Sequence, residues 1–138
     1  MISVELLRHF SLFDQQDDAM LARIANLAEE RVIEAGGTLF SQGDPAKHLY
    51  LVMDGSIVLT MNVGQKGAQT LEELEPLGKD RVVGWSSMVK PHVYKMGAHA
   101  KQKSRVIAFE GDKLRRLFDE NPSFGYYSPL SCYPAEAF

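Results

Sequence analysis

One stretch of the sequence, from Arg81 to Phe109, contains no aspartate or glutamate. Its charged residues are all basic: Arg81, Lys90, Lys95, Lys101, Lys103 and Arg105. Because the whole chain has a formal net charge of −3, this window is a local positive field in an acidic protein. Such a field attracts phosphates and carboxylates, and Lys90 and Lys95 are the better candidates for contact. Lys101 and Lys103 fit at least as well as lysines that guard a sheet edge.

The same window contains Gly84 followed by Trp85, Ser86, Ser87 and Met88. The two serine hydroxyls either donate to an anion or cap a short helix. A hydrolase nucleophile elbow is excluded, because Met88 stands where the second glycine of Gly-x-Ser-x-Gly is needed. The four histidines and the single cysteine show no metal-ligand spacing, and no carboxylate pair stands out. We therefore expect a binding module rather than an enzyme, with no resident cofactor.

Strands are the elements expected to position this window. From Arg31 to Phe109, short apolar runs alternate with glycine-bearing turns, which is typical of antiparallel strands. In His48–Asn62 the apolar alternation continues on both sides of Asp54-Gly55, which predicts a β-hairpin with a tight turn. Further strands are predicted at Thr70–Leu74, around Gly97–Lys101 and at Ser104–Phe109. Together these strands predict a small barrel or sandwich.

Helices are predicted at both ends of the strand region. Apolar residues at helical spacing predict one helix at Val4–Phe10 and a second from Asp14, its N-cap, to about Glu30. A third is predicted at Lys113–Glu120 with Asp112 as its cap. At 138 residues the chain fits one domain. We place that domain at residues 1–127 and an irregular, proline-containing tail at 128–138.

A longer motif connects these elements to a known family. It runs from Gly36-Gly37-Thr38-Leu39-Phe40-Ser41-Gln42-Gly43-Asp44 through Leu49-Tyr50-Leu51-Val52 to Gly55-Ser56-Ile57. This order resembles the cyclic nucleotide-binding domain of catabolite-activator-type regulators, kinase regulatory subunits and gated channels, over roughly residues 5–127. The resemblance implies a mainly β fold with flanking helices, a double-stranded β-helix (jelly-roll or β-roll).

In that family the ligand lies in a phosphate-binding cassette, a turn and short helix whose backbone N–H groups face the cyclic phosphate. The resemblance places the start of the cassette at Gly84. Trp85 then stands where the ribose-binding glutamate belongs, and Tyr94 or Lys95 stands where the phosphate-binding arginine belongs. The ligand-binding candidates are therefore Gly84, Trp85, Ser86, Ser87, Met88, Tyr94 and Lys95. Loss of two charge-assisted hydrogen bonds lowers affinity on the order of 100-fold or more.

Trp85 has three possible roles: a plug that fills the pocket, an aromatic surface that stacks on a ligand ring, or a core position. Two main hypotheses for function follow. In the first, the module senses a small anion, a cyclic nucleotide included, weakly or with altered specificity. In the second, Trp85 closes the pocket and the module binds a protein partner without any ligand. A remote third hypothesis is haem or gas sensing through His92 or His99.

The remaining expectations concern location and partners. A single cysteine and the absence of a signal-like N-terminus favour the cytoplasm. No apolar run reaches the roughly 20 residues that cross a bilayer, so we expect no membrane insertion. The negative charge and the short C-terminal segment after the predicted roll argue against direct nucleic-acid binding. We expect signalling through a protein partner or through a homodimer.

Overall fold

The computed structural model describes residues 2–10, 13, 17–63, 70–73, 76–88 and 91–120. Helices α1 (Val4–Arg8) and α2 (Asp18–Asn26) precede the strands, and α3 (Gly111–Glu120) follows them. The strands are β1 (Ala28–Ile33), β2 (Thr38–Phe40), β3 (His48–Asp54), β4 (Ile57–Val63), β5 (Thr70–Glu73), β6 (Val82–Val83), β7 (Gly97–Ala100) and β8 (Ser104–Glu110). A short 3-10 helix, η2 (Trp85–Met88), lies between β6 and β7. The predicted tail at 128–138 lies outside the described residues.

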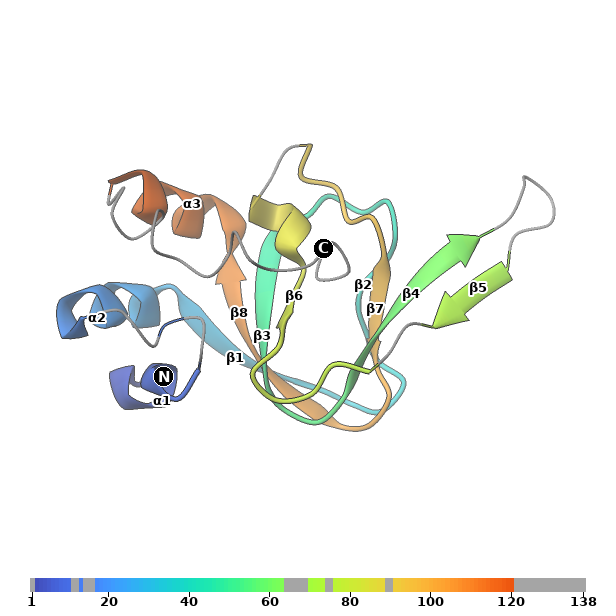
Figure 1. The fold of residues 1–138 in the computed structure, drawn as a ribbon, viewed down its shortest axis with the longest axis horizontal. Helices are drawn as coiled ribbons and strands as arrows, with labels where there is room; N and C mark the ends of the chain where they lie inside the picture. Colours follow the sequence, from blue (N-terminus) through green and yellow to red (C-terminus); the bar gives the residue numbers. More distant parts are fainter. Residues whose placement is uncertain are drawn as a thin grey trace.

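The strands form two antiparallel four-stranded sheets. The first has the order β1-β8-β3-β6 and the second has the order β2-β7-β4-β5. Figure 1 shows the first sheet beside the helices and the second sheet on the far side from them. This arrangement confirms the predicted β-roll with flanking helices.

The central strands β3 and β8 of the first sheet are buried on both faces, and their successive side chains point to opposite sides. Leu49, Leu51, Ile107 and Phe109 face the helices and form the helix-side core with Leu7, Phe10, Leu21, Ile24 and Leu114. The alternate residues Tyr50, Val52, Val106 and Ala108 face the second sheet. With them, the roll interior contains Phe40, Ile57, Leu59, Val83, Tyr94, Met96, Ala98 and Ala100. Alternate residues along these strands therefore enter different cores.

The predicted hairpin at His48–Asn62 is wrong, although both of its strands exist. β3 pairs with β6 and β8, whereas β4 pairs with β5 and β7 in the other sheet. Asp54-Gly55 is thus a corner that carries the chain from one sheet to the other. Gly55 has a φ of 101°, and Ser56 N–H donates to the Ser104 hydroxyl at 3.0 Å across this corner. The chain bends at Gly55, where the turn was predicted, but neither the tight primed turn nor the predicted strand pairing is formed.

The second helix differs from its prediction at both ends. Asp17 is its N-cap and accepts from the Met20 N–H at 2.8 Å, while the predicted cap, Asp14, lies outside the described residues. The helix ends at Asn26, and the residues from Ala28 onward form β1, which pairs with β8 along its whole length. Ala-Glu-Glu is a good helix former, but six residues of ladder pairing outweigh that local preference.

The predicted strands at Thr70–Leu74, Gly97–Lys101 and Ser104–Phe109 correspond to β5, β7 and β8. The last helix begins at Gly111 rather than Lys113, so Asp112 lies in its first turn and not at the cap. Its start is fixed by the Gly111 N–H, which donates to the Lys47 carbonyl at 2.8 Å. No helix in the described part of the chain is long and apolar enough to cross a bilayer.

Candidate ligand site

The predicted cassette is a tight, internally bonded turn. Gly84 has a φ of 86° and opens the 3-10 helix η2, whose first three residues are buried. Ser87 donates two hydrogen bonds to the Gly84 carbonyl, one from its N–H at 3.1 Å and one from its hydroxyl at 2.9 Å. The Ser87 hydroxyl thus bonds back to a carbonyl of its own turn, and Ser87 does not form the predicted cap, in which the side-chain oxygen would accept from an N–H. Met88 is half-buried and packs against the helix-side core.

Trp85 points away from the space between the sheets. Its side chain belongs to the helix-side core, and the residue is only 7% exposed. Leu49, Leu51 and Leu114 are members of the same core. Of the three roles considered for Trp85, its position matches the core role, because the plug and the stacking surface both require a side chain in the roll interior.

Tyr94 occupies the roll interior instead. Its N–H donates to the Asp44 carbonyl at 3.0 Å, and its carbonyl accepts from the Gly43 N–H at 2.8 Å, so its backbone is held on both sides. The ring stacks on Phe40 with 3.7 Å between centroids and 9° between planes. The hydroxyl donates to the His48 carbonyl at 2.6 Å and accepts from the His48 N–H at 3.2 Å. Tyr94 is therefore fixed by backbone, ring and hydroxyl together.

Phe40, His48, Tyr50 and Tyr94 form a continuous group that we call the aromatic cluster. Phe40 lies 6.0 Å from Tyr50, and His48 also lies 6.0 Å from Tyr50, measured between ring centroids. The cluster lies directly beneath the cassette, since a Cβ atom at Gly84 would stand 2.9 Å from the His48 carbonyl oxygen and 3.3 Å from Tyr94 Cε1. The cassette turn thus rests on aromatic side chains of its own chain.

Burial shifts the titration of three members of the cluster. It raises the pKa of the Tyr94 hydroxyl to about 12, although the hydrogen bond with the His48 backbone works in the opposite direction. Burial likewise raises the pKa of Tyr50. The pKa of His48 is lowered, first by burial and then by the positive charge of Arg31. At neutral pH the cluster is therefore uncharged.

The Tyr94 titration is a direct test of this burial. We expect the phenolate absorbance of the wild type, minus that of Tyr94→Phe, to rise with a midpoint near pH 12. Because the unfolded chain loses this proton near pH 10, the contribution of Tyr94 is full below that value and falls as pH rises toward 12. A midpoint near 10 in the folded protein would show that the hydroxyl is in water.

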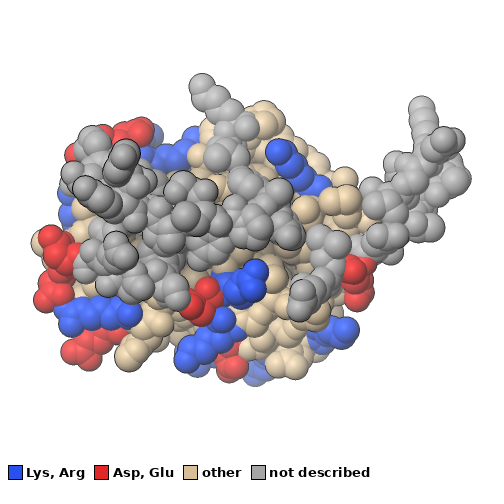
Figure 2. Space-filling model, in the orientation of Figure 1, with Lys and Arg blue, Asp and Glu red and all other residues tan. Residues whose placement is uncertain are grey.

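Among the basic residues of the acid-free window, Lys101, Lys103 and Arg105 lie away from the cassette. Lys101 N–H donates to the Ser56 carbonyl at 2.9 Å, so the exposed Lys101 and Lys103 lie at the opposite end of the roll from η2 (Figure 1). Arg105 bonds to Glu30 at 2.5 Å. Lys95 is exposed, and Lys90 lies outside the described residues. On the face shown in Figure 2, basic and acidic side chains are interspersed.

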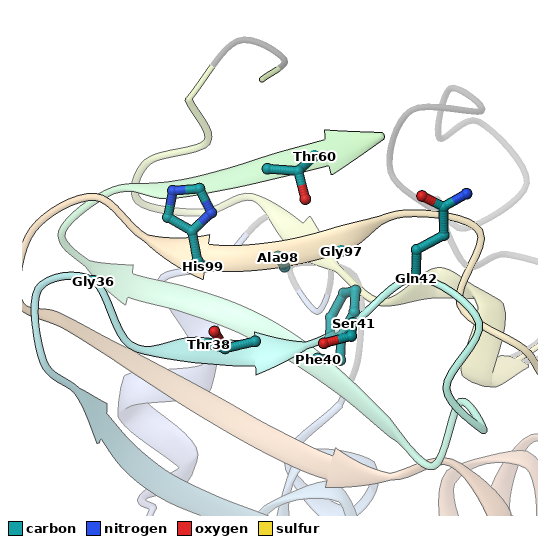
Figure 3. Close-up of a pocket in the computed structure, with 9 residues that line it drawn as sticks. All are labelled: Gly36, Thr38, Phe40, Ser41, Gln42, Thr60, Gly97, Ala98 and His99. Atoms are coloured by element: carbon teal, nitrogen blue, oxygen red, sulfur yellow. The ribbon is translucent and has the colours of Figure 1, made fainter. Parts of the chain in front are cut away.

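A separate hollow of about 450 Å³ lies against strands β2, β4 and β7 of the second sheet. It is lined by Gly36, Thr38, Phe40, Ser41, Gln42, Thr60, Gly97, Ala98 and His99. Figure 3 shows His99 and Thr60 on the same side of β7 and β4, and His99 Nε2 lies 3.8 Å from a Glu73 carboxylate oxygen. The other histidine considered for haem, His92, contacts Arg115 at 2.9 Å. Neither histidine faces the roll interior.

Comparison with known proteins decides the family. The family model "Cyclic nucleotide-binding domain" matches residues 30–121. The chain belongs to this family. A protein named "putative potassium channel protein" from Rhodopseudomonas palustris is 26% identical over 112 residues, which are 81% of this chain and 26% of that protein. This cyclic nucleotide-binding domain thus spans about a quarter of that relative.

Solved structures share the domain's fold. A putative cyclic nucleotide-binding protein from Geobacter metallireducens has a TM-score of 0.79 and 28% identity, with 91% of this chain and 89% of that chain covered. The regulatory domain of Toxoplasma gondii PKA with cAMP has a TM-score of 0.78 and 18% identity, with 94% of this chain and 49% of that chain covered. The latter likeness shows the fold alone.

Within this cyclic nucleotide-binding domain, sequence reasoning missed the neighbours of Tyr94. Phe40 was part of the family motif, but nothing in the sequence indicated that its ring stacks on Tyr94. The sequence did not indicate the position of Arg31 in the sheet, because a helix was predicted to end at about Glu30 and no bounds were predicted for the strand that follows. The alternation of Glu29, Arg31 and Ile33 on one face of β1 is the signal that a correct strand boundary would have revealed.

Proposed function

We propose that this cyclic nucleotide-binding domain is a non-enzymatic regulatory module that binds cyclic nucleotides weakly because Tyr94 fills its roll interior. The observation that carries the proposal is the Tyr94–Phe40 stack, with 3.7 Å between ring centroids. Tyr94 takes the place of the phosphate-binding arginine of the family. The module then acts through a protein partner, with its own aromatic cluster in place of a tightly bound ligand.

The energetics support weak binding. A ligand entering beneath the cassette must separate a stacked aromatic pair, which contributes about 0.5–1.5 kcal/mol beyond its buried area. It must also break the hydrogen bonds between Tyr94 and the His48 backbone, at about 0.5–1.5 kcal/mol each. No arginine or glutamate of the cassette offsets these losses. The expected affinity is therefore on the order of 100-fold or more below that of a domain with both charged residues.

The test is to restore the arginine at Tyr94. We expect Tyr94→Arg to bind cyclic AMP about 10- to 100-fold more tightly than the wild type in an isothermal titration, since it removes the ring and supplies a charge-assisted bond. Lys95→Arg is the matched control, because Lys95 is the neighbouring exposed residue and the other sequence-based candidate. It should leave the affinity unchanged.

Two results would contradict this proposal. One is micromolar binding of cyclic AMP by the wild type, and the other is a larger gain from Lys95→Arg than from Tyr94→Arg. Tyr94→Phe separates the contribution of the ring from that of the hydroxyl. It keeps the stack on Phe40 and removes the hydroxyl that donates to the His48 carbonyl. We expect it to lose about 1–3 kcal/mol of unfolding free energy without gaining affinity.

A second candidate function is sensing of a different small anion. It is supported by one basic side chain, Arg31 of β1, whose positive charge lowers the pKa of His48 and opposes the rise in the pKa of Tyr50. A thermal-shift screen with cyclic nucleotides, other nucleotides and small carboxylates tests it. Ligand at about 100 times its dissociation constant adds about 2.7 kcal/mol of stability. If no compound moves the unfolding midpoint at millimolar concentration, ligand-independent partner binding is favoured.

A further inference from the structure

A hollow of about 310 Å³ lies between helices α2 and α3, which sit side by side next to the first sheet (Figure 1). Residues of α2, its C-cap and α3 line this helix hollow: Arg23, Asn26, Leu27, Lys113, Arg116, Leu117 and Glu120. None of these described lining residues belongs to the cassette, the roll interior or the hollow against β2, β4 and β7. The helix hollow is therefore a separate feature of the domain.

The floor of the helix hollow is apolar. Leu117 is only 5% exposed and belongs to the helix-side core, and the half-buried Leu27 packs against the same core. Both leucines are held in place by the residues packed behind them. An apolar group that enters the hollow therefore meets a preformed surface, which lowers the entropic cost of binding.

The rim of the helix hollow is basic. Arg23, Lys113 and Arg116 are all exposed, and Glu120 is the acidic residue among the described lining. Glu120 is bound to Arg23, with 2.9 Å between Oε2 and Nη2. Lys113 Nζ lies 2.8 Å from a carboxylate oxygen of Glu110. Arg116 has no ion-pair partner in the described part of the chain, so the rim carries an excess of positive charge.

The pair between Arg23 and Glu120 shows that this rim holds a carboxylate. It joins α2 to α3 through side chains that are 51% and 63% exposed. An exposed pair of this kind is weak, so a carboxylate from outside can compete with it. Arg116 also borders a second hollow, but Asp112 and Asp119 line that one and oppose an acidic ligand. The side of Arg116 that faces α2 is therefore the favourable side.

We propose that the helix hollow is a docking site for a protein partner, and that it takes an acidic segment in which an apolar side chain is flanked by carboxylates. The apolar side chain packs on Leu27 and Leu117, and the carboxylates pair with Lys113 and Arg116. The apolar contact supplies affinity, and the basic rim selects acidic segments over neutral ones. The inference rests on the proposed function, in which the module acts through a protein partner, and it names the chemistry of that partner.

The experiment is an NMR titration of the whole chain with the blocked peptide Glu-Leu-Asp-Leu-Glu. We expect saturable shifts of α2 and α3 amides, which weaken with added salt because the rim charges are exposed. Lys113→Gln combined with Arg116→Gln should weaken binding about 5- to 10-fold. The matched control combines Lys101→Gln with Lys103→Gln, which removes the same charge from exposed residues elsewhere. It should change the affinity by less than about 2-fold.

Three further titrations separate the parts of the site. Glu120→Gln removes the competing carboxylate and should strengthen binding by about 2- to 5-fold. A peptide with amides in place of its carboxylates tests the rim, and a peptide with serine in place of leucine tests the floor. Each of the two peptides should bind at least about 5-fold more weakly than the parent peptide.

The proposal is overturned if the peptide causes no saturable shifts of α2 and α3, if the lysine control loses as much affinity, or if inorganic phosphate binds as tightly as the peptide. It is also overturned if ultracentrifugation shows self-association that the variant of Lys113 and Arg116 abolishes, since the occupant is then a second copy. Should that variant fail to fold, Arg116→Gln alone takes its place, with an expected loss of about 2- to 5-fold. The closure by Tyr94 is judged separately, by the cyclic AMP affinity of Tyr94→Arg, so either proposal can fail while the other stands.

Discussion

Replacing Gly55 with alanine should lower the free energy of unfolding by about 2–5 kcal/mol. The backbone there has a φ of 101°, a region in which an L side chain costs about 1–2 kcal/mol. A Cβ atom would also stand 2.2 Å from the Ser104 hydroxyl oxygen and 2.6 Å from the Ser104 Cα. Because a backbone atom cannot move aside locally, the corner must shift, which adds about 1–3 kcal/mol. The free energy of unfolding in urea, compared between the variant and the wild type, measures the sum of the backbone strain and the steric cost.

Gly36 provides the matched control for this substitution. It also has a positive φ, 83°, but a Cβ atom there would meet nothing within 4 Å. Gly36→Ala should therefore cost only the backbone strain, about 1–2 kcal/mol. Equal losses for the two variants would show that the Gly55 corner does not pack closely against Ser104.

The second large effect is expected at Phe40, the residue that supports Tyr94. Phe40→Ala should cost about 3–5 kcal/mol, because it removes a buried ring and leaves a cavity beside Tyr94. Phe40→Leu keeps most of the volume and should cost about 1–2 kcal/mol. Both values come from thermal or urea unfolding of variants compared with the wild type.

The two Phe40 variants also test the coupling to Tyr94. Once the stacking partner is gone, water can approach the phenol, so the Tyr94 pKa should fall from about 12 toward 10 in Phe40→Ala. An unchanged pKa together with a stability loss below about 1 kcal/mol would mean that Phe40 does not hold Tyr94 in place.

Sequence reasoning predicted the strands well and their pairing poorly. The alternation around Asp54-Gly55 determines which residues share a face, but it is the same whether two strands pair or turn a corner. The pairing depends on β8, which is far along the chain and inserts between β1 and β3. In β1, charged side chains on both faces of an edge strand concealed the period of two, so its first residues were taken as helix.

The sequence predicts where the candidate site lies along the chain, but it does not predict which of its side chains face the roll interior. Trp85 and Tyr94 were both assigned to the pocket from their motif positions, and the structure places them on opposite sides of the first sheet. Sequence could not separate them, because the positive φ of Gly84 redirects the chain just before Trp85. Tyr94 faces inward because Gly43 and Asp44 bind its backbone, contacts that join residues 50 positions apart.

The most direct test of the account is whether the rings of Tyr94 and Phe40 stay in contact when cyclic AMP is present. Their centroids are 3.7 Å apart, so nuclear Overhauser effects between the two rings should be strong in the free protein. We predict that these effects persist unchanged at micromolar cyclic AMP. Their absence in the free protein, or their loss at micromolar cyclic AMP, would contradict a roll interior filled by Tyr94.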